Sequence, residues 1–165
     1  MSHLDFLSPD LASPEAVWRS PLERALAHAP EGMEDLSRTG VLDVRGEIDG
    51  LDAGEGEVVR LTPERALVLC SFEEAGAQRA RLAGAGRLVI DVSAGWAGLL
   101  IRGEPLMRRL TDLDLDGLPA VGALAHVQAL VLRDDADTFR LYVPQEYGHY
   151  VAEVTIDAAR GLAEA

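Results

Sequence analysis

The chain has 165 residues, 48% hydrophobic and 26% charged, a composition that can bury the core of one domain. Its formal net charge of −13 argues against nucleic-acid partners and disfavours binding to anionic membranes. Cys70 is the only cysteine, so a disulfide within the chain is impossible, and we expect a cytoplasmic protein without a membrane span or secretory signal.

The first predicted element is a short helix that follows an N-terminal arm. We assign residues 1–18 to the arm and residues 19–165 to a single domain. Ser20 can cap a helix, Pro21 suits its first position, and Glu23 completes a capping box. The helix should end before Pro30, because the residue before a proline disfavours helical backbone.

The rest of the first half predicts three strands and a second helix. Ser71 and Glu74 form another capping box, for a helix that runs to about Leu82 with Gly84 as its stop. A glycine-rich loop and a tight turn separate the strands. From the alternation of apolar and polar residues we place the strands at 41–45, 57–61 and 66–70.

The second half predicts strands joined by turns, then a long final helix. A short helix begins after Gly103, and an aspartate-rich turn at 134–137 closes a hairpin. We expect strand 96–101 to pair with or continue its predecessor. The strands are placed at 87–92, 96–101, 124–132 and 138–143.

The final helix should open at Pro144 and end at Gly161. Gly148 inside it suggests the close approach of a neighbour. Four residues recur at helical spacing and should face inward: Tyr147, Val151, Val154 and Ala158.

One phrase occurs twice in the chain. Residues 35–47 and 91–104 each begin with Asp-x-Ser, continue with an apolar run and end in Arg-Gly-Glu. Each copy opens a half, at about 34–84 and 87–161, and each half continues with a hairpin and a helix. We therefore predict an α+β fold, a degenerate duplication of ferredoxin-like β-α-β-β-α units with antiparallel sheets.

Several short motifs follow the order found in one superfamily. The first phrase resembles the N-terminal signature of the glycine-cleavage T-protein, a folate-dependent aminomethyltransferase. The second phrase, with Gly95-Trp96-Ala97, is similar to the gamma subunit of heterotetrameric sarcosine oxidase. The similarity covers about residues 19–160 and includes three further segments: Arg19–Leu22, Leu61–Leu69 and Phe139–Val143 with Tyr147.

The resemblance implies a non-catalytic subunit that docks on a larger flavin- and folate-dependent amine-oxidising partner, or that self-associates. The stretch 126–130 lacks the carboxylate that catalytic members carry on the folate-pocket strand, so we expect no catalytic residue and no firmly bound cofactor. Tetrahydrofolate remains possible. The alternative is a small tetrahydrofolate-dependent aminomethyltransferase-like protein, in which Arg140, Glu146 or Tyr147 would contact the pterin.

The candidate contacts for a ligand or partner lie in the second half. Aromatic residues with a polar tip are favoured at partner surfaces and in ligand pockets, and core packing is an equal alternative for them. The candidates are Trp96, Arg140, Tyr142, Glu146, Tyr147 and Tyr150.

Other chemistry-bearing residues favour structural roles. The repeated Asp-x-Ser should hydrogen-bond nearby backbone and set a turn. His126 should be a core or interface residue. Glu146 and His149 should share a helix face, but two groups do not make a metal site, so we expect no metal. The chain has no lysine, which excludes lysine Schiff-base chemistry.

Overall fold

The computed structural model describes residues 18–83 and 86–164. The predicted arm, apart from Trp18, and the predicted helix stop at Gly84 lie outside the described residues. No helix in the described ranges is long and apolar enough to span a membrane.

The chain forms nine strands and four α-helices in the described ranges, with short 3₁₀ turns between some of them. The first half contains α1 (Glu23–Leu26), β1 (Met33–Asp35), β2 (Thr39–Arg45), β3 (Glu57–Thr62), β4 (Arg65–Ser71) and α2 (Ala75–Leu82). The second half contains β5 (Leu88–Asp91), β6 (Trp96–Arg102), α3 (Glu104–Leu110), β7 (Ala120–Leu124), β8 (Val127–Arg133), β9 (Thr138–Pro144) and α4 (Gly148–Ala163).

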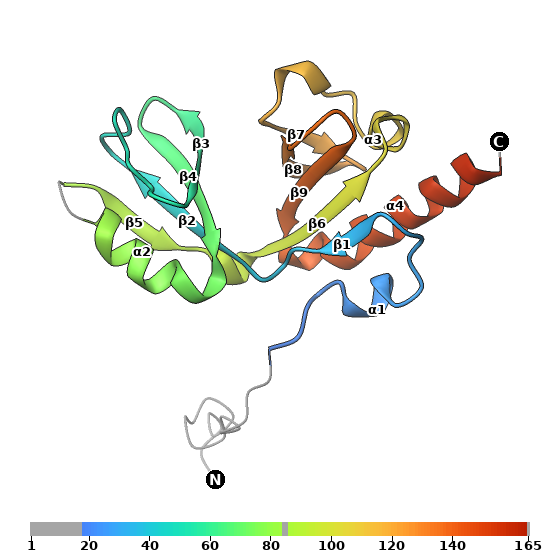
Figure 1. The fold of residues 1–165 in the computed structure, drawn as a ribbon, viewed down its shortest axis with the longest axis horizontal. Coiled ribbons are helices and arrows are strands. Elements are labelled where there is room, and N and C mark those ends of the chain that lie inside the picture. The colour runs from blue at the N-terminus through green and yellow to red at the C-terminus, as the bar shows by residue number, and fades with distance from the viewer. Residues whose placement is uncertain (1–17, 84–85, 165) are drawn as a thin grey trace, which may run out of the picture.

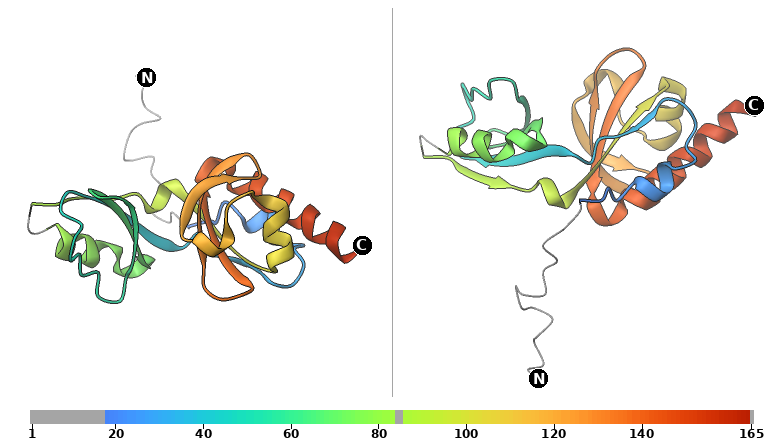
Figure 2. Two further views of the ribbon diagram at one scale, coloured as in Figure 1. Left: turned by 90° about the horizontal axis from the view of Figure 1, so that it is seen from above. Right: turned by 60° about the horizontal axis from the view of Figure 1, so that its bottom comes forward.

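The strands form two antiparallel sheets, which confirms the predicted α+β class. One sheet has the order β1-β6-β9-β8-β7 and the other has the order β3-β4-β2-β5. Figures 1 and 2 show the sheets as two lobes side by side, joined where the chain crosses between them. We call them the β6 lobe and the β2 lobe.

The two halves of the chain exchange their first strands. β1, from the first half, pairs with β6, and β5, from the second half, pairs with β2. Each copy of the repeated phrase therefore crosses from one lobe to the other. The expectation that strand 96–101 pairs with or continues 87–92 is wrong, because β5 and β6 lie in different sheets.

Three apolar clusters hold this arrangement together. In the β6 lobe, α1, α3 and α4 cover one face of the sheet around Phe139 and Met107, both 0% exposed. In the β2 lobe, α2 covers a cluster that contains Leu42 and Val68. A third cluster packs between the two sheets, so the lobes share a core.

The long strand predicted at 124–132 is instead a hairpin. Residues 120–124 form β7, and β8 returns from Val127. Ala125 and His126 make the turn, with φ of 47° and 66°. The prediction failed because hairpin turns of this kind usually carry Asn or Gly, and here the turn residues are Ala and His.

The helices differ from prediction mainly at their ends. α1 is a single turn, and Ser20 Oγ accepts from the Leu22 N–H at 3.0 Å as a cap would. None of its four residues is buried, so packing does not extend it. Ser71 forms no capping box, because its hydroxyl donates to Glu73 Oε2 at 3.0 Å and a 3₁₀ turn precedes α2.

α4 runs through Gly161 to Ala163, so Gly161 is not its end. Tyr147 precedes the helix and is 47% exposed, which corrects its predicted inward position. The predicted close approach at Gly148 is confirmed, because a Cβ there would lie 2.5 Å from the Ala97 Cβ. The helix is thus packed directly on β6 at its first residue.

Candidate functional site

The junction of the lobes is built by the first copy of the repeated phrase. Asp35 Oδ1 accepts from the Ser37 N–H at 2.8 Å and sets the turn after β1. Ser37 Oγ then accepts from the Gly98 N–H at 3.2 Å. The Leu36 N–H donates to the Gly98 carbonyl at 2.8 Å. These bonds attach the crossing chain to β6 of the other half.

The second copy makes the reciprocal connection. Asp91 Oδ1 accepts from the Ser93 N–H at 3.0 Å, and Ser93 Oγ accepts from the Val41 N–H at 2.9 Å. The Val92 N–H donates to the Val41 carbonyl at 3.0 Å. Val41 in the first copy and Gly98 in the second each lie four residues before the Arg of Arg-Gly-Glu. The predicted turn-setting role of Asp-x-Ser is confirmed, and each serine also binds the opposite copy.

Apolar side chains fill the space between the sheets beside this crossing. Tyr142 is 2% exposed there, and Trp96 is half-buried against the cluster. The cluster comprises Val41, Val59, Leu67, Leu69, Leu130, Leu132 and Tyr142, with Leu61, Val92 and Trp96 partly buried around it. Two of the predicted candidate residues therefore contribute to the packing of the lobes.

Arg140 links the two lobes by charge. Its guanidinium donates to the Asp134 carboxylate through both Nε and Nη2, and Nη2 lies 2.6 Å from Asp134 Oδ1. Nη2 also lies 2.8 Å from Glu57 Oε2, on β3 of the other lobe. Burial would lower the pKa of Arg140, but the hydrogen bonds from Asp134 and Glu57 raise it well above its usual range. The guanidinium is held permanently charged between two carboxylates.

A pocket of about 350 Å³ opens between the lobes at this point. Tyr142 contributes its hydroxyl, 3.4 Å from Thr39 Oγ1. Cys70 also lines it, and burial, together with the charges of Glu74 and Asp91, raises the pKa of its thiol. The lining residues are Leu36, Thr39, Glu55, Glu57, Leu69, Cys70, Ser71, Arg140 and Tyr142. A protonated thiol is a poor nucleophile, so this pocket presents hydrogen-bonding and charged groups rather than an activated attacking atom.

The remaining candidates lie elsewhere. Glu146 and Tyr147 are exposed in the 3₁₀ turn between β9 and α4. Tyr150 is 44% exposed in the first turn of α4, and its hydroxyl donates to the Ala125 carbonyl at 3.2 Å. The structure thus brings Trp96, Arg140 and Tyr142 together at the lobe junction and leaves the other three outside it.

The two histidines considered in the sequence are both exposed. His126 lies in the β7–β8 turn, so it is not a core residue, and its role at an interface stays a prediction. His149 Nε2 lies 3.2 Å from Glu153 Oε1, one helical turn ahead, and Glu146 lies in the 3₁₀ turn before α4. Within residues 18–83 and 86–164, no group of three His, Cys, Asp or Glu side chains could hold a metal ion.

Sequence reasoning missed a charged cluster in the middle of β2. Asp43 is 3% exposed and accepts from Arg45 Nη2 at 2.7 Å and from Arg65 Nε at 3.0 Å. Burial would raise the pKa of Asp43, but the hydrogen bonds and charges of the two arginines outweigh it and lower that pKa. An aspartate inside an otherwise apolar strand was the available signal.

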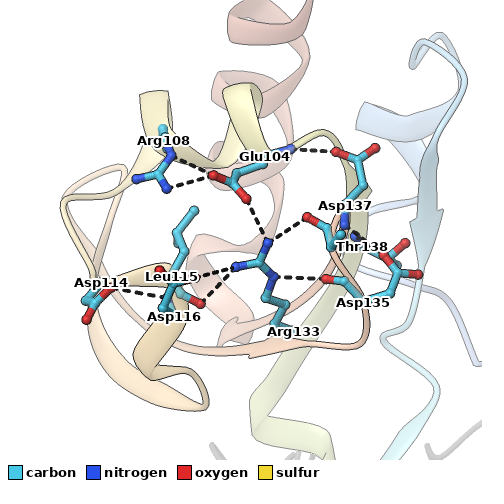
Figure 3. Close-up of polar contacts among 10 residues, drawn as sticks. Glu104, Arg108, Asp114, Leu115, Asp116, Arg133, Asp135, Asp137 and Thr138 are labelled. Carbon is cyan, nitrogen blue, oxygen red and sulfur yellow. Dashed lines mark hydrogen bonds and ion pairs between the residues drawn. The ribbon is translucent and has the colours of Figure 1, made fainter.

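It also missed the role of Arg133, at the end of β8. Figure 3 shows its guanidinium between α3, the 115–117 turn and the β8–β9 hairpin. Nη2 donates to Glu104 Oε2 at 2.7 Å, Nη1 to Asp116 Oδ1 at 3.2 Å, and Nε to the Asp135 carbonyl at 2.9 Å. Hydrogen bonds from Arg108, and to a lesser extent from Arg133, lower the pKa of Glu104. Nothing in the sequence around Arg133 indicates this role.

Comparison with known proteins rests on structure. No protein-family model matches the sequence, and no curated protein matches it either. A chain of heterotetrameric sarcosine oxidase from Corynebacterium sp. U-96 matches over 90% of this chain and 97% of its own length, with a TM-score of 0.72 and 20% identity. The two chains share one fold.

Two further solved structures also match this fold. Glycine cleavage system aminomethyltransferase T from Bartonella henselae matches over 85% of this chain, with a TM-score of 0.56 and 18% identity. This chain spans about half of that enzyme, 49% of its length. The regulatory subunit of aspartate kinase from Thermus thermophilus also matches, with a TM-score of 0.50 and 12% identity over 77% of this chain. The superfamily resemblance seen in the sequence is thus supported at the level of fold.

Proposed function

We propose that this chain is a non-catalytic subunit of an assembly similar to heterotetrameric sarcosine oxidase, docked on a larger flavin- and folate-dependent amine-oxidising partner in the cytoplasm. The observation that carries the proposal is the match to one chain of that assembly over 97% of its length. Because the match covers a whole chain of that assembly and not a fragment, it supports a comparable subunit role for this chain.

The chemistry of the lobe junction supports a structural role. Arg140 is occupied by Asp134 and Glu57, and Tyr142 is buried in the packing between the lobes. The thiol of Cys70 is kept protonated by burial and by neighbouring carboxylates. These groups stabilise the relative position of the lobes, which is what a rigid docking module requires.

The test is to recover the assembly from the source organism. The tagged chain should co-purify with a flavoprotein, seen as flavin absorbance in the eluate and as amine-dependent formation of peroxide. Excess untagged chain should compete the flavoprotein away, whereas the tag alone should capture none. A chain that purifies without flavin under conditions where it is folded and abundant would contradict the proposal.

The alternative, a tetrahydrofolate-binding aminomethyltransferase-like protein, has one favourable observation, the pocket of about 350 Å³ between the lobes. Its walls carry Glu55 and Glu57, which would repel the anionic tail of a folate. Glu146 and Tyr147 are not among its lining residues. Calorimetry with tetrahydrofolate tests this alternative, and an absence of binding heat at millimolar ligand would exclude it.

A further inference from the structure

The strand β5 leaves one edge of the β2-lobe sheet open. It pairs with β2 on one side, and within the described residues no strand pairs with its other side. Figure 2 shows β5 along the outer edge of the lobe. Two apolar side chains on this strand face water, Leu88 at 56% and Ile90 at 37% exposed. An open edge with exposed apolar side chains is a place where another strand can be added.

The pairing with β2 fixes which backbone groups of β5 point outward. The Val92 N–H donates to the Val41 carbonyl, and hydrogen-bonded pairs alternate along an antiparallel ladder. Ile90 and Leu88 therefore direct their backbone groups toward β2. The N–H and carbonyl groups of residues 89 and 91 point away from the sheet, toward the position that a new strand would take.

The side chains of this strand are complementary to a second copy of themselves. Because side chains alternate, Leu88 and Ile90 lie on the open face of the sheet. Arg87, Val89 and Asp91 lie on the face that α2 covers. Two copies of β5 can pair antiparallel with Val89 opposite Val89. Arg87 then lies opposite Asp91 of the other copy, and the two apolar residues lie opposite each other. A register shifted by two residues would put Val89 opposite one of the charged residues and lose this match.

Both charged residues have atoms left for a partner. Arg87 donates through Nε to the Glu47 carbonyl at 2.5 Å, and Asp91 Oδ1 accepts from the Ser93 N–H and hydroxyl. Neither side chain forms an ion pair with any group in residues 18–83 and 86–164. The Nη atoms of Arg87 and Oδ2 of Asp91 can therefore bind each other across two copies.

The other charges near β5 limit the strength of such a pairing. On the open face Arg45, opposite Leu88, is already held by Asp43 at 2.7 Å. On the other face α2 contributes the exposed Arg79. Two copies that each carry a net charge of −13 also repel one another, although salt at about 0.15 M screens this repulsion beyond roughly 8 Å. An association through two short strands should therefore be weak and reversible.

We propose that two copies of this chain associate through β5, about a two-fold axis at Val89, and join their four-stranded sheets into one. Arg87 of each copy pairs with Asp91 of the other, and Leu88 packs against Ile90. A second copy is the occupant that this edge fits, because its charges and its apolar residues match in a single register. The proposal is independent of docking on a flavoprotein.

The first experiment is sedimentation equilibrium of the full chain between about 10 and 500 µM in roughly 0.15 M NaCl. We expect a monomer–dimer equilibrium with a Kd of about 100 µM. Arg87→Glu places a like charge opposite Asp91 and should weaken the dimer at least about tenfold. Arg79→Glu makes the same change in net charge from α2 and should change the Kd by less than about twofold.

A second pair of variants tests the apolar contact. Ile90→Lys should weaken the dimer at least about tenfold, because a lysine on an edge strand opposes the addition of another strand. Val121→Lys is the matched control, since Val121 is 44% exposed on β7, an edge strand of the other lobe. It should leave the Kd unchanged within about twofold.

Disulfide cross-linking tests the register. In a Cys70→Ala background, a chain with Leu88→Cys is mixed with a chain with Ile90→Cys and oxidised. The mixture should give a cross-linked dimer, because the two positions lie directly opposite in a pair without backbone hydrogen bonds. Either chain alone should give little, since like positions are two residues out of register and more than about 7 Å apart.

The proposal is overturned if the wild-type chain stays monomeric at about 500 µM, as it would if β5 accepted only a strand of another protein. It is also overturned if Arg79→Glu weakens the dimer as much as Arg87→Glu, or Val121→Lys as much as Ile90→Lys. Self-cross-linking of either cysteine variant, as efficient as that of the mixture, would exclude the register.

Discussion

Gly98 is a point of close approach between the two halves of the chain. Its backbone N–H and carbonyl bind Ser37 and the Leu36 N–H of the other half. A Cβ on Gly98 would lie 2.6 Å from the Leu36 carbonyl oxygen and 2.9 Å from Tyr142 Cε1. The nearest obstacle is backbone that holds the crossing, so it cannot swing away as a flexible side chain could. Gly98→Ala should therefore push the two copies of the repeated phrase apart.

We expect Gly98→Ala to lower the free energy of unfolding by about 3 kcal/mol. Overpacking of a closed site costs about 1–3 kcal/mol, and each weakened hydrogen bond adds about 0.5–1.5 kcal/mol. For a chain of this size the melting temperature should fall by about 6–12 °C. Urea unfolding followed by circular dichroism measures the change directly.

Gly95→Ala is the matched control, because a Cβ at Gly95 meets nothing within 4 Å and the residue lies in the same connection. It should change stability by less than about 0.5 kcal/mol. In the Gly98→Ala background, Ser37→Ala should cost less than it does alone, since the bond it removes is already weakened. Equal stability of Gly98→Ala and Gly95→Ala would refute the assignment of Gly98 to the crossing.

Three further changes test the charged clusters and one helix. Asp43→Asn should destabilise the chain by about 2 kcal/mol at neutral pH, because Arg45 and Arg65 lose their buried partner. The pKa of Asp43 is lowered on folding, so its stabilisation is complete above the unfolded value of about 3.9 and is lost as the pH falls through the folded value. Wild type should therefore lose more stability than Asp43→Asn in acid unfolding curves below about pH 4, and parallel curves would contradict this reasoning. Arg133→Lys should lower the free energy of unfolding in urea by about 2 kcal/mol, because an ammonium group cannot donate to α3, the 115–117 turn and the hairpin together. An unchanged urea midpoint would mean that the cluster in Figure 3 adds no stability. Gly76→Ala in α2 should raise the free energy of unfolding by about 0.5–1 kcal/mol, since a Cβ there meets nothing within 4 Å and alanine favours a helix over glycine. A loss of thermal stability would show that α2 is not helical at this point.

The candidate site shows where sequence reasoning stops. Trp96 and Tyr142 are 46 positions apart in the sequence. They pack in one cluster because β6 and β9 are adjacent strands. Their aromatic character was visible in the sequence. The position of Tyr150 could not be read from the sequence. It depends on α4 packing on β6 at Gly148, which places Tyr150 against the β7–β8 turn.

Sequence alone determined the local structure of this protein. Alternating residues fixed most strands, and Asp-x-Ser set its turns through bonds that span two residues. Tertiary structure decided which sheet each strand joins. The exchange of β1 and β5 depends on bonds such as Ser37–Gly98 and Ser93–Val41, between residues more than fifty positions apart. Such contacts follow from packing of the whole chain, and no local pattern encodes them.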